Sequence, residues 1–399
     1  MPYLDYAASA PLRAEALEAM RPFLEAPVAN PSSQHGPGRA ARHAVETARE
    51  QVAALVGADP TAVVFTSGGT EADNLAVKGA PLARDPAERR LVVSGVEHHA
   101  VLDAAAWAAA DVGAEVHLAP VDATGRVLLD RLGALLAPGR TALVAVMAAN
   151  NEVGTLQPVA AAAELAHAAG ALLLCDAVQA AGLPGVDLRR DGIDLLALAA
   201  HKLGGPTGVG ALVIRAGTPP LRPLLHGGGQ ERGLRSGTLP VAAIAGFGAA
   251  AAAALAERTS SQAQPAGAPP AGAAALRALR DRLLAGLRGT APGLQVNGDP
   301  APEGGLPGLL SVRFPGVRSE DLLLLDRAGV ACSAGSACAS GAVSASHVLL
   351  AMGRTAEEAR ETVRFSLGHG STVADVDAAV AAVRQALAVL APAAAGGAR

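Results

Sequence analysis

Lysine is rare in this chain of 399 residues, which makes the position of each lysine informative. Only two of the 32 basic side chains are lysines, Lys78 and Lys202, and arginine carries the rest of the positive charge. A codon bias toward Ala, Gly, Arg and Pro explains that excess, but arginine cannot be deprotonated to a nucleophilic amine, whereas lysine can. Lys78 falls within the helical stretch NLAVKGA, so we expect it to be solvated and assign it no role.

Lys202 follows a short apolar run and stands in the glycine-rich sequence AHKLGG. At the end of a strand in a covered sheet its amine would be partly desolvated, which favours the neutral form. A neutral amine can form a Schiff base with an aldehyde. The plainer alternative is a surface lysine in a turn, which the scarcity of lysine makes less attractive.

Two further segments place polar groups where apolar runs end. Asp176 follows the run LLLC, and an aspartate there can pair with the protonated ring nitrogen of a cofactor or simply cap the next helix. The segment TSGGTE, from Thr66 to Glu71, joins a strand pattern to a helical one. Its small residues and the N–H groups of a helix start could cradle a phosphate, and an ordinary capped turn is the alternative.

A thiol and an arginine complete the set. Cys338 lies among small residues in CSAGSACASG, a setting that suits a reactive thiolate on a mobile loop. We expect Cys175 and Cys332 to be buried small side chains, and the three cysteines lack the spacing of a metal site. Arg364 lies within a strand pattern and requires a carboxylate partner, either a substrate's or one of the protein's own.

The elements that must position these residues alternate between strands and helices. Six short apolar runs predict strands at Ala62–Phe65, Leu91–Ser94, Glu115–Leu118, Thr141–Met147, Ala171–Cys175 and Asp194–Leu198. Amphipathic stretches between them predict helices, among them Ala40–Val56, His99–Ala110 and Val159–Ala169. This alternation indicates an α/β fold with a mostly parallel sheet covered by helices. Gly210–Ile214 follows closely and is expected to be an antiparallel addition.

The last third of the chain predicts a smaller α+β domain. Its expected elements are Leu276–Leu287, Leu309–Phe314, Glu320–Ala328, Thr362–Ser366 and Val373–Leu390. We divide the chain into a large domain at 15–255, a low-complexity mobile insertion at 258–272, a small domain formed by 1–14 with 273–392, and a flexible tail at 393–399.

Composition limits the function classes. A net charge of −4 gives no support for a nucleic-acid or anionic-membrane partner. No uninterrupted apolar run approaches the roughly 20 residues of a membrane span. The first residues, MPYLDYAASAPLR, lack the basic-then-apolar pattern of a leader, so we expect no signal peptide. Because three cysteines make no disulfide framework, we expect a protein of the reducing cytoplasm.

Ordered motifs extend from Tyr3 to Gly368. They are YLDYAASAP at Tyr3, NPSSQH at Asn30, TSGGTEADN at Thr66, EHHAVL at Glu97, NNEVGTLQP at Asn150, DAVQ at Asp176, HKLGGPTGVG at His201, HGGGQERGLRSGT at His226, SAGSAC at Ser333 and VRFSLG, which ends at Gly368. With these motifs the chain resembles the NifS/IscS-like cysteine desulfurases of the class V aminotransferase superfamily. The resemblance implies the pyridoxal-phosphate-dependent transferase fold of type I, pyridoxal 5'-phosphate as cofactor, and a homodimer.

Carried over by position, the resemblance also implies roles. Lys202 would hold the cofactor as a Schiff base and move the α-proton, Cys338 would accept sulfur, and His98 would stack on the ring and relay a proton. The cofactor-binding residues would be Lys202, Asp176, Gln179, His98, Gly69, Thr70, His201, Asn151 and, from the other subunit, Thr238. Arg364, Asn151 and Asn30 would bind the substrate.

The implied reaction converts L-cysteine to L-alanine, with the sulfur carried as a persulfide on Cys338. The sulfur would pass to an acceptor protein such as an iron–sulfur scaffold or a tRNA-thiolation enzyme. A selenocysteine lyase or another class V aminotransferase on the same fold remains the alternative. The chain departs from the family at Ala199, where a phosphate-binding serine is usual, and this change removes one hydrogen bond worth on the order of 1 kcal/mol.

Overall fold

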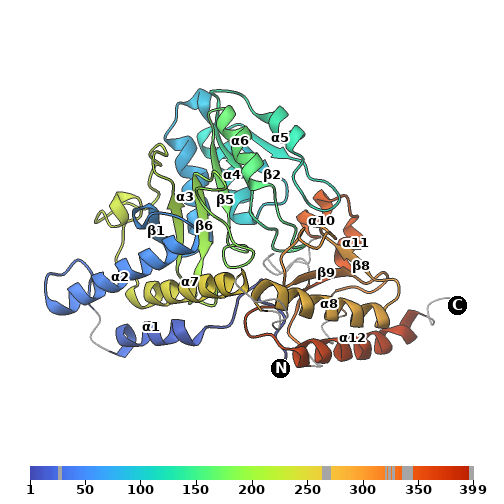
Figure 1. Cartoon of the computed structure of the whole chain (residues 1–399). Coiled ribbons are helices and arrows are strands. Elements are labelled where there is room, and N and C mark those ends of the chain that lie inside the picture. Colours follow the sequence, from blue (N-terminus) through green and yellow to red (C-terminus); the bar gives the residue numbers. More distant parts are fainter. Residues whose placement is uncertain are drawn as a thin grey trace.

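The computed structural model describes residues 1–25, 29–262, 271–319, 321, 325, 329–334 and 345–394 (Figure 1). A seven-stranded sheet forms its centre, with the strand order β1-β7-β6-β5-β4-β2-β3. These strands are β1 Val63–Thr66, β2 Arg90–Ser94, β3 Val116–Ala119, β4 Thr141–Ala145, β5 Leu172–Asp176, β6 Leu195–Ala199 and β7 Gly210–Ile214. Each predicted strand is present within a few residues of its expected ends, and we attribute the shifts to local hydrogen bonding.

All neighbouring pairs from β3 through β6 are parallel, and only β7 runs against its neighbours. The expected antiparallel strand therefore exists, and it lies between β6 and β1. Parallel strands end at the same edge of a sheet, so the segments that follow β1, β2, β4, β5 and β6 start close together.

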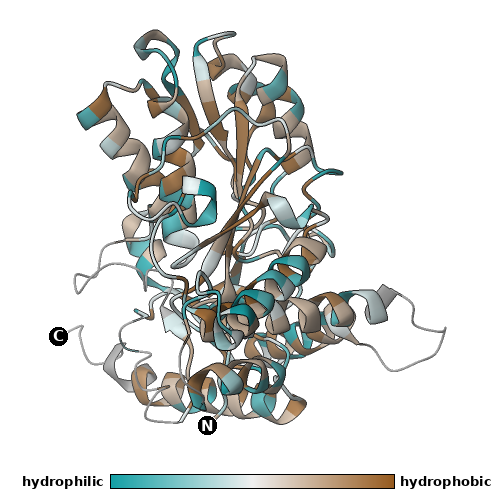
Figure 2. Cartoon of the chain, turned by 90° about the vertical axis from the view of Figure 1, so that its left-hand side faces the viewer, coloured by the Kyte–Doolittle hydropathy of each residue, from teal (hydrophilic) through white to brown (hydrophobic). Residues whose placement is uncertain are grey.

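Helices cover both faces of this sheet, as the alternation predicts. The large part of the fold contains α1 Ala14–Glu25, α2 Gly36–Leu55, α3 Gly69–Leu82, α4 His99–Val112, α5 Leu129–Leu135, α6 Val159–Ala168 and α7 Val241–Gln262. In β5, Leu173 and Cys175 pack toward α2, α6 and α7, whereas Leu172 and Leu174 pack toward α3 and α4. This period of two separates two apolar cores, and Figure 2 shows the hydrophobic strands between more polar helices.

A second, antiparallel sheet has the order β10-β11-β9-β8. Its strands are β8 Gln295–Asn297, β9 Leu309–Arg313, β10 Ser333–Ala334 and β11 Thr362–Ser366, with helices α8 Gly272–Thr290, α10 His347–Ala351, α11 Ala356–Arg360 and α12 Val373–Ala394. The helices α8 and α12 pack side by side on this sheet and enclose a third apolar core. The chain's first residues join the same sheet, because Asp5 pairs in parallel with Ser366 of β11.

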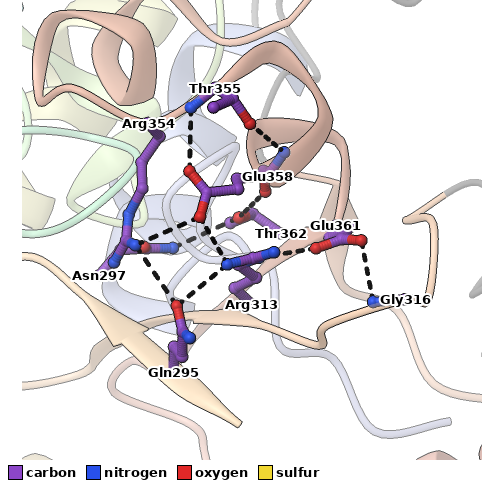
Figure 3. A network of polar contacts seen from close by, with 9 residues as sticks. All are labelled: Gln295, Asn297, Arg313, Gly316, Arg354, Thr355, Glu358, Glu361 and Thr362. Atoms are coloured by element: carbon purple, nitrogen blue, oxygen red, sulfur yellow. Dashed lines mark hydrogen bonds and ion pairs between the residues drawn. The ribbon is translucent and has the colours of Figure 1, made fainter. Parts of the chain in front are cut away.

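A polar network fixes the strand that carries Arg364 (Figure 3). Arg313 of β9 donates to Glu361 at 2.6 Å and to Glu358 at 2.7 Å, and Glu361 in turn accepts the N–H of Gly316 at 2.8 Å. Glu358 also closes a capping box with Thr355 at the start of α11. Partly buried, charge-assisted contacts of this kind favour one register of β11 on β9.

The insertion expected at 258–272 is shorter in the structure than the composition suggested. Helix α7 continues to Gln262 and α8 begins at Gly272, while residues 263–270 lie outside the described residues. The extension of α7 has a physical cause, because Arg258 donates to the carbonyl of Leu55 at 2.8 Å and so holds the helix against α2. Residues 258–262 are therefore helical, and the division of the chain into domains stays a prediction.

The stretch Val241–Ser260 of α7 is long and apolar enough to cross a membrane, but half of it is buried inside the protein. It packs against α1 and α2. This is the environment of a core helix in a globular protein, so α7 is no argument for a membrane partner.

Candidate active site

The predicted catalytic groups gather at the carboxyl edge of the large sheet. Asp176 is the last residue of β5, and Lys202 ends a short 3-10 turn, Ala200–Lys202, that follows β6. His98 stands between β2 and the first residue of α4. The three side chains interact electrostatically with one another, which places them in one site.

The amine of Lys202 is held by the N-terminal segment. Its Nζ donates to the carbonyl oxygen of Ala8 at 2.8 Å and to that of Ala7. The amide of Gln179 donates to the same Ala7 oxygen at 2.9 Å. The segment YLDYAASAP therefore positions two predicted cofactor ligands through its backbone, a role that its side chains gave no reason to expect.

Burial controls the protonation of Asp176 and His98. Asp176 is 6% exposed, and burial raises the pKa of its carboxyl, although the Val178 N–H at 2.9 Å and the nearby His98 and Lys202 oppose that rise. Burial also lowers the pKa of His98, so its imidazole is neutral near pH 7. His98 uses Nδ1 to accept the N–H of Ala100 at 3.1 Å, which caps α4 and fixes the ring.

The segment between β1 and α3 has the form of an anion cradle. Gly68 precedes the helix without any side-chain cap, so the N–H groups of the first turn remain available. A Cβ on Gly210 of β7 would lie 2.7 Å from the Cα of Gly68, so glycine is required for this close approach. A Cβ on Gly68 itself would meet nothing within 4 Å, which shows that the cradle is open.

A cavity of about 240 Å³ lies over this cradle. Its lining residues are Ser67, Gly68, Gly69, Thr70, Glu71, His201, Thr207, Gly208 and Val209. Burial, together with the neighbouring Lys202, lowers the pKa of His201 to about 4, so its imidazole is neutral and can donate to an anion through one nitrogen. Gly69, Thr70 and His201, which the resemblance assigned to cofactor binding, thus share one cavity.

Arg364 on β11 reaches the same edge from the small sheet. It is 5% exposed and donates through Nη1 to the backbone oxygen of Asn151 at 2.8 Å and through Nη2 to Asp5 at 2.8 Å. Its buried Nε has no hydrogen-bond partner among the described residues. Of the two partners that the sequence allowed for Arg364, the structure contains the protein's own carboxylate, Asp5. One N–H donor of Arg364, at Nε, remains without a partner among the described residues.

These residues fit a phosphorylated aldehyde cofactor. The open helix start, the Thr70 hydroxyl and His201 provide donors for a phosphate, and the amine of Lys202 lies beside a buried carboxyl that can pair with a protonated ring nitrogen. The described residues contain no group of His, Cys, Asp and Glu able to hold a metal ion.

The structure describes two of the three cysteines, Cys175 and Cys332. Cys175 is fully buried and Cys332 is partly buried against the third core, as expected for small apolar side chains. Burial raises the pKa of the Cys332 thiol to about 12, so it carries no thiolate near pH 7. Cys338, the predicted sulfur acceptor, lies outside the described residues.

Two predicted site residues stand apart from the others. The Asn30 carboxamide is exposed before α2 and accepts the N–H of Ser32 at 2.9 Å, and within the described ranges no hydrogen bond joins it to another predicted site residue. Thr238 is exposed and is not among the residues that line the cradle of its own chain. Lys78 corrects a minor expectation, because it is half-buried and its amine lies 4.5 Å from the ring centre of Trp107.

Sequence reasoning missed several residues that the fold brings to the site. Asp5 pairs with Arg364, Glu71 and Arg235 form an ion pair beside the cradle, and Glu97 is buried near Asp176. Their motifs could be recognised, but their partners are far away in the sequence. An acid in one motif and an arginine in another give no signal of contact until the fold is known.

Comparisons with known proteins agree with this geometry. The model of the family "Aminotransferase class-V" matches residues 2–379. The chain is 46% identical to a cysteine desulfurase of Cereibacter sphaeroides, with 94% of this chain and 92% of the relative covered. It is 44% identical to an IscS-like cysteine desulfurase of Mycobacterium tuberculosis, with 95% and 94% covered. The solved structure of a NifS-like protein matches with a TM-score of 0.86 and 35% identity, covering 97% and 99% of the two chains.

Proposed function

This chain belongs to the class-V aminotransferase family and is a pyridoxal-phosphate-dependent cysteine desulfurase, and on that premise we propose which of its side chains convert L-cysteine to L-alanine. Pyridoxal phosphate, when bound, supplies an electron sink for the charge left at the substrate's α-carbon. The cradle over Gly68, Gly69 and Thr70, with His201, would hold the phosphate. Lys202 would hold the cofactor covalently, and Asp176 would keep its ring nitrogen protonated.

The substrate carboxylate would bind at Arg364 and Asn151. Arg364 is the buried cation of the site, and its Nε is free to donate. A guanidinium matches a carboxylate with two parallel hydrogen bonds, which fixes orientation as well as charge. The backbone of Asn151 already accepts from Arg364, so this residue would position the guanidinium for the substrate.

Proton movement would fall to Lys202 and His98. As a free amine, Lys202 would take the α-proton of the substrate, and the carbonyl groups of Ala7 and Ala8 hold its Nζ near the site. His98 is neutral because it is buried, so it can accept a proton from the substrate thiol or pass one to the product.

Cys338 would then take the sulfur. Its thiolate attacks the substrate sulfur, the Cβ–S bond of the substrate breaks, and an S–S bond to Cys338 forms. The substrate carbon gains a proton and leaves as alanine, so one cysteine and one thiol give one alanine and one persulfide. Cys332 is unsuited to this role because its thiol remains protonated near neutral pH.

We also propose the setting in which the enzyme works. It would act as a homodimer in the cytoplasm, with Thr238 completing the phosphate site of the other subunit. The persulfide would pass to an acceptor protein, either an iron–sulfur scaffold or a tRNA-thiolation enzyme. Support for the dimer comes from Thr238, which is exposed and does not line the cradle of its own chain.

The observation that carries the proposal is the position of Lys202 beside Asp176 and His98 at the edge that also holds an open anion cradle. The test is alanine release from L-cysteine with a reductant, for the wild type and for Lys202→Ala. We expect release only from the wild type. Borohydride reduction followed by peptide mass spectrometry is expected to find the cofactor on Lys202.

Two outcomes would change this assignment. Alanine release from Lys202→Ala, with cofactor still attached to the protein, would exclude the proposed role of the lysine. A parallel assay with L-selenocysteine separates the alternatives, since turnover of selenocysteine without turnover of cysteine would indicate a selenocysteine lyase.

A further inference from the structure

The segment from Leu225 to Gly237 crosses close to the phosphate cradle without forming part of it. Its backbone has positive φ at two residues that are not glycine, Glu231 at 45° and Arg232 at 58°. Such conformations cost free energy and persist where surrounding contacts enforce them. Contacts from this segment reach both β1, which ends at the cradle, and α3, which begins there.

The first contact joins this segment to the strand that enters the cradle. Glu231 is 7% exposed, accepts the N–H of Phe65 in β1 at 2.7 Å, and pairs with Arg49 at 2.8 Å. Phe65 is one residue before the end of β1. A buried, fully paired carboxylate thus fixes the segment to this strand.

The second contact joins the segment to the helix that leaves the cradle. Arg235 donates through Nε to Glu71 at 2.9 Å, and both side chains are largely buried, at 16% and 17% exposure. Glu71 stands in the first turn of α3, and its other oxygen accepts the N–H of Ser67 at 2.7 Å. Glu71 therefore both fixes the cradle backbone and lines its cavity.

A carboxylate in that place has an electrostatic consequence. The start of a helix attracts an anion, but a partly buried negative charge in the same cavity repels it. Burial raises the pKa of Glu71, yet the hydrogen bonds from Arg235 and Ser67 outweigh burial and lower it, so Glu71 is ionised near pH 7. Arg235 is the cation that compensates this charge.

We propose that Arg235 is a positioning residue that sets the anion affinity of the cradle by neutralising Glu71, with Glu231 holding the segment that carries it. Arg235 does not line the cavity and so acts through Glu71. The inference rests on the proposed function in one respect, because it takes the phosphate of the cofactor to be the anion.

The test compares ligands that differ by the phosphate alone. Apoenzyme is titrated with pyridoxal phosphate, pyridoxal and inorganic phosphate. For Arg235→Gln we expect the affinity for pyridoxal phosphate and for inorganic phosphate to fall on the order of tenfold, because Glu71 is left uncompensated, while the affinity for pyridoxal is unchanged. Arg282→Gln is the matched control, since it removes an exposed arginine–aspartate pair between α8 and α12.

A second variant tests whether the charge of Glu71 is what weakens phosphate binding. Glu71→Gln keeps an oxygen for the Ser67 N–H but removes the negative charge, so we expect it to bind phosphate as tightly as the wild type or more tightly. The double variant Arg235→Gln with Glu71→Gln should regain most of the affinity that Arg235→Gln loses. This pair also tests the inference if Arg235→Gln alone does not fold.

Three results would overturn the inference. They are an unchanged pyridoxal phosphate affinity in Arg235→Gln, an equal loss for pyridoxal, and a loss in Glu71→Gln as large as in Arg235→Gln. Failure of the proposed function would give a different result. If the wild type binds inorganic phosphate more tightly than Arg235→Gln does, but does not bind pyridoxal phosphate, the inference stands and the proposed cofactor is excluded.

Discussion

Arg364 and Asp5 form an ion pair between the last strand of the small sheet and the first residues of the chain, with Nη2 and Oδ1 2.8 Å apart. Arg364 is buried and Asp5 is about one-fifth exposed. The pair sits where the substrate carboxylate is proposed to bind, so substrate and Asp5 share one guanidinium. Substrate affinity should then depend on both residues, and in opposite directions.

The first prediction follows from that competition. Arg364→Gln removes the cation, and we expect KM for L-cysteine to rise at least tenfold while covalent cofactor on Lys202 is retained. Asp5→Asn frees the guanidinium, and we expect an equal or lower KM together with a lower melting temperature, because a buried charge loses its partner. Steady-state kinetics and thermal denaturation check both variants. A raised KM in Asp5→Asn as large as that in Arg364→Gln would mean that Asp5 orients Arg364 rather than competing for it.

Much of the fold could be predicted because its signals are local. Apolar runs such as Leu195–Ala199 and their spacing to helices indicated a parallel sheet, and the antiparallel direction of Gly210–Ile214 followed from its short connection. The alternation of faces in β5 required only a period of two. These features depend on neighbours in the sequence and not on distant partners.

For the site, the sequence predicted the residues that lie in recognisable motifs but not the partners that hold them. Asp176 and Lys202 were expected at one edge because each stands at the end of an apolar run, whereas His98 came from the resemblance alone, and the structure brings the three together at the carboxyl ends of β5, β6 and β2. Their roles stay predictions. The backbone carbonyl groups of Ala7 and Ala8 were not predicted as partners of Lys202, since this contact spans more than 190 residues. The same reason explains why Asp5 was not recognised as the partner of Arg364.

A second prediction separates the cysteines. Cys338→Ala should abolish alanine release and leave the cofactor bound to Lys202, because the sulfur then has no acceptor. Cys332→Ala should keep most of the activity, since burial holds the pKa of this thiol at about 12 and it contributes no thiolate. Alanine assays are combined with mass spectrometry of the persulfide after alkylation. Alanine release from Cys338→Ala would indicate a lyase that needs no thiol.

A third prediction concerns Ala199, where the family usually has a serine. Ala199 is 3% exposed, and its Cβ lies 3.6 Å from the position that a Cβ on Gly69 would occupy, at the start of α3. Ala199→Ser would restore a hydroxyl beside the cradle, so we expect pyridoxal phosphate to bind about fivefold to tenfold more tightly. The control is Ala197→Ser, which adds a hydroxyl deeper in the same strand. Equal or weaker binding in Ala199→Ser would show that the cradle is complete without it.

A fourth prediction is that protonation of Glu152 makes the free energy of unfolding depend on pH. Its carboxyl accepts the hydroxyl of Ser346 at 2.5 Å, and burial raises its pKa to about 7, against the opposing effects of Ser346, Arg364 and His99. The folded protein therefore keeps a proton that the unfolded chain has already lost above its ordinary pKa of 4.5. Since the carboxyl of Glu152 binds more protons in the native state than in the unfolded chain, its contribution to the free energy of unfolding falls as pH rises from about 4.5 to about 7.

Glu152→Gln removes this titration while keeping an oxygen for Ser346. Relative to the wild type, we expect the variant to gain free energy of unfolding between pH 5 and pH 8, by about 1–3 kcal/mol. Urea denaturation of the apoenzyme at the two pH values measures the difference. Glu357→Gln on the exposed face of α11 is the control and should show no such gain. Parallel pH profiles for Glu152→Gln and the wild type would mean that Glu152 is ionised in the fold, in which case Arg364 and His99 outweigh its burial.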